Sequence, residues 1–294
     1  MRIGILSRGR LNYSTRRLGR AANRRGHRVT LMDPFDCTMF VAAGRPRILH
    51  RGRSVEGLHV LIPRLSSATA RYGLEVIAHF EWVGVPSVNP AEAIATARNK
   101  WRALRALSEA GVPVPASFAA GSTEGLERAV ARIGGYPFLI KPFEGTQGNG
   151  LILLETATTA ALTLDTLWNL RQDYVAQRFY AESAGSDVRV LVVGDRVLGA
   201  MQRVAAPGEF RANFHRGGLG RAIPIEEEIA ELAVRAARAV GLGVAGVDLL
   251  LTHEGPVVLE VNPSPGFEGF EQATGADVAD AIVAYAERIA RTPS

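Results

Sequence analysis

The residues with the clearest capacity for chemistry lie near the C-terminal end, in the stretch DLLLTHEGPVVLEVNPSPG that runs from Asp248 to Gly266. Two apolar runs joined by a short polar turn predict a β-hairpin. Glu260 and Asn262 are two positions apart and therefore point to one face of their strand, and the hairpin can bring Asp248 beside them. Carboxylate and amide oxygens are ligands that Mg²⁺ accepts. Because an acid within an apolar run is costly to bury alone, we interpret the set as a divalent-metal site rather than a buried hairpin with stray polar residues.

A second group of residues surrounds the glycine-rich loop EGTQGNG, residues 144–150. Backbone N–H groups of such a loop can approach phosphate oxygens closely. A plain hairpin turn explains the glycines about as well, and no GK[ST] follows as in a Walker loop. Lys141 precedes the loop, and Lys100 is the only other lysine in a chain with 32 arginines. We interpret Lys141 as a residue that can neutralise phosphate charge, with an exposed surface lysine as the alternative. The scarcity of lysine makes Lys100, at the start of a helix, notable as well, but composition alone assigns it no role.

A third group is the donor-rich segment GEFRANFHRGG, residues 208–218. Arg211 and Arg216 within it, together with Arg203 ahead of it, predict a region that holds an anionic intermediate, because guanidinium groups match carboxylate and phosphate oxygens. A solvated loop is the alternative. Nothing in the sequence prepares His215 to act as a base, and we interpret Cys37, the single cysteine, as core filler.

The elements that must position these groups alternate in the first part of the chain. Strands are expected at 2–7, 29–33, 58–63 and 85–88, and helices at 14–25 (capped by Ser14) and 70–83. This alternation predicts a parallel sheet covered by helices. No GxGxxG follows the first strand, so a dinucleotide site is not supported. Ser7, Arg8 and Arg64 directly follow strands, at the sheet edge where open α/β folds bind ligands.

The rest of the chain mixes strands and helices less regularly. Asn89-Pro90 is expected to cap a helical stretch that runs to Ala110. Further helices are expected at 122–133, 158–170, 226–240 and 277–291, and strands at 138–140, 151–154, 174–179, 187–193 and 196–202. We therefore expect three domains: an N-terminal Rossmann-like domain at 1–95, a central lobe with the glycine-rich loop at 96–180, and a C-terminal lobe with the metal site at 181–294.

Together these motifs resemble the ATP-grasp superfamily, and within it the RimK-type branch that contains the ribosomal protein glutamate ligase. The resemblance rests on Lys100, Lys141 with EGTQGNG, GSDVRVLVVGD, FRANFHRGG and the C-terminal hairpin, with further support from LSR, DPFDC and IPR earlier in the chain. It spans nearly the whole sequence, and the set is specific although no single motif is. It implies an α/β fold class, α+β in the later domains: an ATP-grasp fold preceded by a small Rossmann-like parallel-sheet domain.

The resemblance also implies roles by matching position. The ATP-binding residues would be Lys100, Lys141, Gly145, Thr146, Gln147, Gly148 and Gly150 around the phosphates, Arg178 and Phe179 at the adenine hinge, Asp187 near the ribose, and Arg211, Ala212 and Asn213 on the phosphate side. Asp248, Glu260 and Asn262 would bind Mg²⁺ or Mn²⁺, with a pair of ions per subunit. Arg178 departs from the family pattern, which usually has an acidic residue before the aromatic one.

The implied reaction is an ATP-dependent ligation of a carboxylate to an amine. An acceptor's C-terminal carboxylate would attack the γ-phosphate, and the amine of L-glutamate would then attack the acyl phosphate, with Arg203, Arg211 and Arg216 stabilising the developing charge. The implied acceptor is the tail of small-subunit ribosomal protein six, with extension to poly-α-glutamate. One alternative is a ligase of the same fold that adds another amino acid to a small molecule or carrier protein. Another is a nucleotide-gated protein that binds ribosome or RNA without turnover.

Charge is unevenly distributed along the chain. Residues 1–100 contain 17 basic and 6 acidic residues, whereas 101–294 contain 17 and 23. A basic N-terminal third suits an acidic product or the ribosome, and a solvated arginine-rich surface would also explain it. No nucleic-acid-binding motif accompanies the charge. We expect a cytoplasmic protein without membrane contact, because the sequence has no apolar run of about 18 residues, no signal-peptide pattern and a single cysteine. The family resemblance implies a homo-oligomer.

Overall fold

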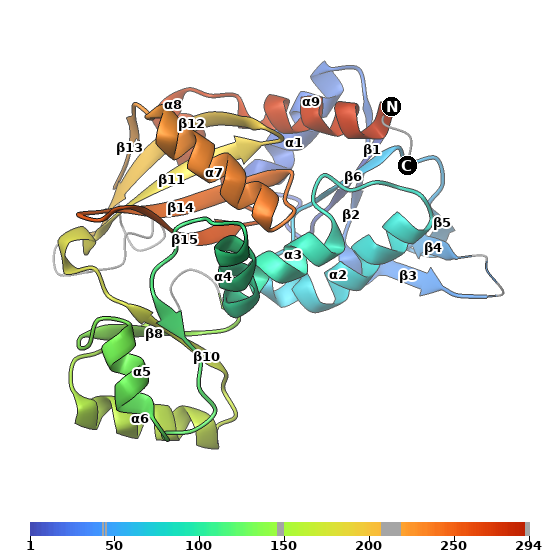
Figure 1. The fold of residues 1–294 in the computed structure, drawn as a ribbon. Helices are drawn as coiled ribbons and strands as arrows, with labels where there is room; N and C mark the ends of the chain where they lie inside the picture. The colour runs from blue at the N-terminus through green and yellow to red at the C-terminus, as the bar shows by residue number, and fades with distance from the viewer. Residues whose placement is uncertain (43, 45, 146–149, 207–218, 292–294) are drawn as a thin grey trace.

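A computed structural model describes the chain except residues 43, 45, 146–149, 207–218 and 292–294, and Figure 1 shows its fold. The N-terminal part contains a parallel sheet in the order β2-β1-β6. Its strands are β1 (Arg2–Leu6), β2 (Arg28–Met32) and β6 (Val60–Pro63), and its helices are α1 (Tyr13–Arg24) and α2 (Ser67–Trp82). The register pairs Ile3 with both Val29 and Val60. The expected βαβ arrangement is therefore present.

Several local expectations for this part were wrong. Helix α1 is capped by Asn12 rather than Ser14. The expected strand at 85–88 is reduced to a single parallel bridge between Leu61 and Ser87. A small antiparallel sheet between β2 and β6 was not predicted from the sequence. It consists of β3 (Cys37–Phe40), β4 (Arg47–His50) and β5 (Arg53–Ser54), and it follows a short 3-10 helix at Pro34–Asp36. Burial raises the pKa of the Cys37 thiol to about 12, as expected for a core residue.

The single helix expected between residues 90 and 110 is two helices, α3 (Ala91–Arg98) and α4 (Lys100–Glu109). The break falls at Asn99, whose backbone is extended (φ −93°, ψ 108°) and whose side chain accepts a hydrogen bond from the Arg102 N–H. The backbone N–H of Lys100 donates instead to the Phe143 carbonyl at 2.8 Å. The break therefore places Lys100 at a helix start that contacts the chain next to the glycine-rich loop.

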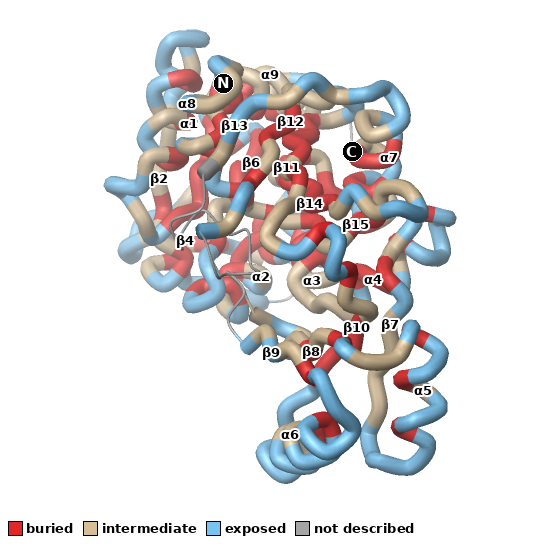
Figure 2. Tube along the Cα trace, turned by 90° about the vertical axis from the view of Figure 1, so that its left-hand side faces the viewer, coloured by how far each residue is buried: buried red, intermediate tan, exposed pale blue. Residues whose placement is uncertain are grey.

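The central lobe is an antiparallel sheet in the order β7-β10-β8-β9. Its strands are β7 (Ser117–Phe118), β8 (Phe138–Pro142), β9 (Ile152–Leu154) and β10 (Tyr174–Arg178), and its helices are α5 (Leu126–Arg132) and α6 (Ala157–Asn169). The helices cover one face through a separate apolar cluster that includes Phe138, Ile140, Leu164 and Tyr174. Figure 2 shows that α5 and α6 are largely exposed, whereas buried positions concentrate in the body formed by the other two sheets.

The C-terminal lobe is an antiparallel sheet in the order β13-β12-β11-β14-β15. Its strands are β11 (Ser186–Val193), β12 (Arg196–Val204), β13 (Leu219–Ile223), β14 (Val244–Thr252) and β15 (Gly255–Asn262). Helix α7 (Glu227–Ala239) packs on one face, while α8 (Glu268–Thr274) and α9 (Val278–Arg291) pack elsewhere on the sheet and on the N-terminal domain, and a 3-10 turn at Ala181–Ser183 precedes the lobe. In β11, Val188 and Val190 belong to the cluster under α7. The intervening positions therefore carry the charged side chains to the opposite face.

Much of the N-terminal charge excess is neutralised within the molecule. Helix α1 packs against α9, and its basic side chains meet acids of the C-terminal helices. Arg17 bonds to Glu271 at 3.0 Å and to Asp277 at 2.9 Å. Arg25 and His27 both reach Glu287, at 2.8 and 2.6 Å. Part of the basic excess of residues 1–100 is therefore used in ion pairs with the C-terminal helices of the same chain.

This interface carries a testable stability prediction. We expect Glu271→Gln to lower the free energy of unfolding by about 1–2 kcal/mol, because the carboxylate accepts charge-assisted hydrogen bonds from Tyr13 and Arg17 in a largely buried position. Urea denaturation checks the value. Asp195→Asn is the matched control, since its pair with Arg238 has both side chains more than 60% exposed (64% and 63%) and should contribute almost nothing. Equal effects from the two variants would contradict the interface assignment.

No helix in the described part of the chain combines the length and apolar character needed to cross a bilayer.

Candidate active site

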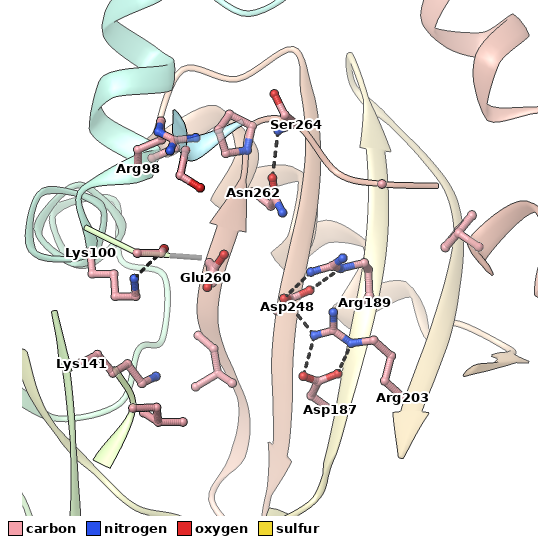
Figure 3. A pocket seen from close by; sticks show the side chains of 18 of the residues that line it. Arg98, Lys100, Lys141, Asp187, Arg189, Arg203, Asp248, Glu260, Asn262 and Ser264 are labelled. Atoms are coloured by element: carbon pink, nitrogen blue, oxygen red, sulfur yellow. Dashed lines mark hydrogen bonds and ion pairs between the residues drawn. The ribbon is translucent and has the colours of Figure 1, made fainter. Parts of the chain in front are cut away.

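A cavity of about 770 Å³ has walls from all three parts of the molecule. Ser7 and Arg64 line it from the N-terminal sheet, Lys141 from the central lobe, and Asp248 and Glu260 from the C-terminal lobe. Figure 3 shows the lysines on one side of Glu260 and the charged side chains of the C-terminal sheet on the other. The volume is in the range of small-molecule sites, and the convergence of many charged groups indicates a polar ligand.

The hairpin that the sequence predicted is present, and its register places the expected metal ligands together. Asp248 lies directly opposite Glu260, and Gly246 lies opposite Asn262. The pairing shifts by one residue after Asp248, so that Leu259 is the extra residue of a β-bulge. The bulge lets Val258 pack in the core while Leu259 and Glu260 both line the cavity. The bulge is a feature that the sequence pattern did not reveal.

Asp248 is held by two arginines. Arg189 donates to both of its carboxylate oxygens at 2.7 Å, and Arg203 reaches it at 2.9 Å. Burial opposes ionisation, but the two guanidinium groups lower the pKa of Asp248. A carboxylate offers about four lone-pair positions. N–H groups of Arg189 and Arg203 occupy three of these lone-pair positions. One position on the Asp248 carboxylate is left for a cation.

Asp187 shares Arg203 with Asp248. The Arg203 guanidinium donates to both oxygens of Asp187 at 2.6 Å, and it is only 3% exposed. Burial raises the pKa of Asp187 to about 6, although the pair with Arg203 opposes this shift. Asp187 and Arg203 both line the cavity, and the predicted contact of Asp187 with a ribose stays a prediction. Because Arg203 already balances two carboxylates, its most direct effect is to fix Asp187 and Asp248, and its action on a developing charge stays a prediction.

The two lysines lie on the wall opposite the acids. Lys141 donates to Gln177 Oε1 at 2.5 Å, and Lys100 donates to the Gly145 carbonyl at 3.1 Å. Burial lowers the pKa of Lys141 to about 8 and also lowers that of Lys100, while Glu260 raises both. Neither ammonium group has an ion pair within the described residues. Two incompletely neutralised cations beside a cavity favour an anionic ligand.

The expected adenine hinge borders the same cavity. Arg178 and Phe179 both line it. The Arg178 guanidinium bonds to both oxygens of Glu254 at 3.1 and 2.8 Å and lies over the Tyr180 ring at 4.8 Å. This pair links the central lobe to the turn of the C-terminal hairpin. Arg178 therefore has partners in the protein, and its contact with a base stays a prediction.

Part of the predicted site lies outside the described residues. These positions are Thr146, Gln147, Gly148, Arg211, Ala212, Asn213, His215 and Arg216. Gly145 and Gly150 flank the undescribed residues 146–149. Gly150 has a φ of +77°, and two Pro142 side-chain atoms lie 3.1 Å from the position that a Cβ would take. This conformation requires glycine.

Sequence reasoning missed several residues of the cavity. Arg98 and Arg189 line it, and Gln177 orients Lys141. Asn89, expected as a helix cap, instead bonds to both the N–H and the carbonyl of Val244 and to the Pro263 carbonyl, all at 2.8 Å. It thereby ties the N-terminal domain to the start of β14 and to the residue that directly follows β15. Alternation on β11 could have suggested Arg189, which is two positions from Asp187 on the same face.

The chemistry of the donor set fits a hard divalent cation shared with phosphate. Among the described residues no cluster of three or more His, Cys, Asp or Glu side chains could by itself hold a metal. Asp248, Glu260 and Asn262 instead offer two carboxylates and an amide, with Asn262 Oδ1 fixed by the Ser264 N–H at 2.9 Å. Mg²⁺ is commonly bound by one or two carboxylates together with substrate phosphates. The arrangement suits an ion that arrives with a polyphosphate.

Comparisons with known proteins agree with this geometry. A family model described as a RimK PreATP-grasp domain matches residues 1–94, and one described as a RimK-like ATP-grasp domain matches residues 97–286. The chain is 43% identical to a probable alpha-L-glutamate ligase of Ectopseudomonas mendocina, over 98% of this chain and 96% of that protein. It is 44% identical to probable alpha-L-glutamate ligase 1 of Hahella chejuensis, over 98% and 95% of the two chains.

Solved structures share the fold at lower identity. The ATP-grasp ligase PsnB, in complex with a phosphomimetic precursor variant, Mg and ADP, superposes with a TM-score of 0.74 at 23% identity, covering 99% of this chain and 98% of that one. A RimK domain ATP-grasp protein from Sphaerobacter thermophilus gives 0.74 at 24% identity, covering 97% and 99%. The predicted ATP-grasp architecture with a preceding parallel-sheet domain is thus confirmed.

Proposed function

Because the chain belongs to the RimK-like ATP-grasp family and is an ATP-dependent ligase that forms C–N bonds, we propose that it joins L-glutamate to the C-terminal carboxylate of a protein acceptor. The observation that carries the proposal is the cavity in which Lys100 and Lys141 face Asp248 and Glu260. The names of relatives 43–44% identical over nearly the whole chain support glutamate as the amino acid.

ATP and Mg²⁺ are the cofactors of this proposal. Lys141 and Lys100 would hold phosphate oxygens, and Asp248, Glu260 and Asn262 would hold a pair of Mg²⁺ or Mn²⁺ ions. The metal would neutralise phosphate charge and orient the γ-phosphate. The described residues place no evident general base beside the lysines. The protein's contribution is therefore positioning and electrostatic stabilisation, as is common in phosphoryl transfer.

The proposed reaction has two steps. A carboxylate oxygen of the acceptor bonds to the γ-phosphorus, the bond to the bridging oxygen breaks, and ADP leaves. The amine nitrogen of glutamate then bonds to the activated carbonyl carbon, inorganic phosphate leaves, and the amine loses a proton. Lys141, held by Gln177, and Lys100, held by the loop carbonyl of Gly145, are fixed where charge accumulates on the phosphate. Arg211 and Arg216 are proposed to add to this field.

The proposed acceptor is the tail of small-subunit ribosomal protein six, with repeated addition producing poly-α-glutamate. An acidic growing product suits Arg8 and Arg10, which are exposed on the loop that leads to Asn12 at the cavity wall. We also propose that the enzyme is cytoplasmic and that it forms a homo-oligomer. Gel filtration with light scattering measures the molar mass in solution and so tests the oligomeric state.

The acceptor and the amino acid can be identified together by mass spectrometry. We expect a ladder of glutamate-sized additions on an acceptor peptide with a free C-terminus after incubation with ATP, Mg²⁺ and glutamate, and none on the same peptide with an amidated C-terminus. Parallel reactions with each other amino acid test the alternative of a same-fold ligase with another substrate. ATP binding without any amino-acid-stimulated ADP release would contradict the ligase assignment and favour a nucleotide-gated binding protein.

A further inference from the structure

Arg64 directly follows β6, on the part of the cavity wall built by the N-terminal domain. Its Nη2 donates to the Pro265 carbonyl at 2.7 Å, and its guanidinium carbon lies 5.7 Å from the centre of the Phe267 ring. These contacts fix the plane of the guanidinium group. Neither supplies a negative charge, so the group is positioned without being neutralised.

The charge of Arg64 lacks a counterion in the described part of the chain. Arg189 and Arg203, on the same cavity, each pair with an aspartate, but no described carboxylate forms an ion pair with Arg64. Burial alone lowers the pKa of its guanidinium group to about 10. Arg64 is half-buried at the cavity wall. A cation without a counterion beside a cavity favours a bound anion, because the anion neutralises its charge.

The surroundings of Arg64 match a carboxylate. The Ser264 hydroxyl lines the cavity, and its oxygen is buried with no hydrogen-bond partner among the described residues. The N-terminal ends of α1 and α2 also border the cavity through Asn12 and Ser66. Helix N-termini favour negative charge because the helix dipole carries a partial positive charge there. The cavity is therefore lined by a guanidinium group, by a hydroxyl without a hydrogen-bond partner among the described residues, and by the starts of two helices. The bond from Arg64 to the Pro265 carbonyl places the guanidinium group next to the Ser264 segment.

We propose that Arg64, assisted by Ser264, binds a carboxylate of the incoming glutamate. This inference rests on the proposed function, in which the lysine pair already receives the phosphates. Glutamate reacts through its amine, so an ion pair to one of its carboxylates leaves the nucleophile free, whereas the same pair to the acceptor carboxylate would weaken the attacking oxygen. The Ser264 N–H also fixes Asn262 Oδ1, which couples the position of the amino acid to the metal ligands.

The first test is a kinetic comparison of Arg64→Met with wild type. We expect the KM for glutamate to rise on the order of 50-fold, because a charge-assisted hydrogen-bonded pair is lost, with the KM for ATP nearly unchanged. Arg64→Lys keeps the charge without the two-pronged geometry and should recover part of the affinity. Arg71→Met is the matched control, since Arg71 is exposed on α2. A rise in the KM for the acceptor peptide instead of glutamate would overturn the assignment.

A second test removes the charge from the substrate. Glutamine lacks the side-chain carboxylate of glutamate, and the α-amide of glutamate lacks the α-carboxylate. Wild type should discriminate strongly against the analogue that lacks the carboxylate bound by Arg64. Arg64→Met should lose most of that discrimination. Unchanged discrimination in the variant refutes the inference. Circular dichroism melting verifies that the variant is folded. If wild type ligates a different amino acid, the proposed function fails, while a selective loss of affinity for that amino acid in Arg64→Met would still identify Arg64 as its carboxylate ligand.

Discussion

Glu260→Gln is expected to lower glutamate-dependent ADP release by on the order of a thousandfold, since the metal contributes several kcal/mol to the stabilisation of transferring phosphate. Glutamine keeps the size of the side chain but supplies a neutral oxygen. Glu260 is the carboxylate opposite Asp248 in the hairpin register, and, unlike Asp248, it has no hydrogen bond or ion pair among the described residues. Its oxygens are therefore the most available metal ligands in the cavity.

The measurement is a coupled assay of ADP release across a range of Mg²⁺ concentrations. Loss of a metal ligand raises the Mg²⁺ concentration needed for half-maximal rate, whereas a loss of general folding does not shift that dependence selectively. Glu227→Gln, on the exposed first turn of α7, is the matched control and should behave as wild type. Unchanged turnover in Glu260→Gln would remove Glu260 from the metal site.

Lys141→Met is expected to weaken ATP binding by about 100-fold while making the protein more stable. The ammonium group is a charged hydrogen-bond donor to phosphate, worth roughly 2–3 kcal/mol. In the free protein, burial lowers its pKa from 10.5 to about 8, so the folded state binds this proton less tightly than the unfolded state does. At pH 7 that difference costs up to about 3 kcal/mol of stability, which methionine removes.

The sign of the pH dependence follows from the lowered pKa. Below pH 8, Lys141 is charged in the folded protein, and the whole cost of burying this charge lowers the free energy of unfolding. Between pH 8 and 10.5 this cost declines, because Lys141 loses its proton in the folded protein before it does so in the unfolded chain. Wild-type stability should therefore rise relative to Lys141→Met across this window. ATP affinity should change in the opposite direction, falling up to about tenfold per pH unit above pH 8, because only the charged ammonium attracts phosphate.

Denaturant unfolding and ATP titration calorimetry at pH 7 and 9 check both halves of this prediction. Arg102→Met is the control, because Arg102 follows the Asn99 cap at an exposed position of α4. A variant that binds ATP normally, or one that loses both stability and ATP binding, would contradict the description of Lys141 as a buried cation held ready for phosphate.

The features that the sequence predicted well are those decided by short spacing. Glu260 and Asn262 share a strand face because side chains alternate, and the polar turn between two apolar runs sets the hairpin that returns Asp248 to them. Lys100 and Lys141 were recognised because lysine is rare in this arginine-rich chain. The N-terminal βαβ unit and helix α7 were also predicted from the sequence, because hydrophobic periodicity is a local property.

Other features depend on segments that are distant in the sequence. Three short strands at 37–54 were missed because they carry no clear alternation. At the helix break at Asn99, the Lys100 N–H donates to the carbonyl of Phe143, which is more than 40 positions later in the chain. The basic character of residues 1–100 suggested an outside partner, yet Arg17 and Arg25 pair with acids more than 250 positions later in the chain.

The sequence by itself thus determined the family, the hairpin that brings Asp248 beside Glu260, and the two lysines of the cavity, because each is defined by residue type and short spacing. Only the tertiary structure decided how much charge each side chain retains. Arg189 and Arg203 lie within strands and Arg64 directly follows one, and residue type alone does not show which of the three has a carboxylate partner. Packing gives the first two aspartate partners and leaves Arg64 with a backbone carbonyl and an aromatic ring. Ionisation and binding depend on such through-space neighbours and on burial, which the order of residues does not record.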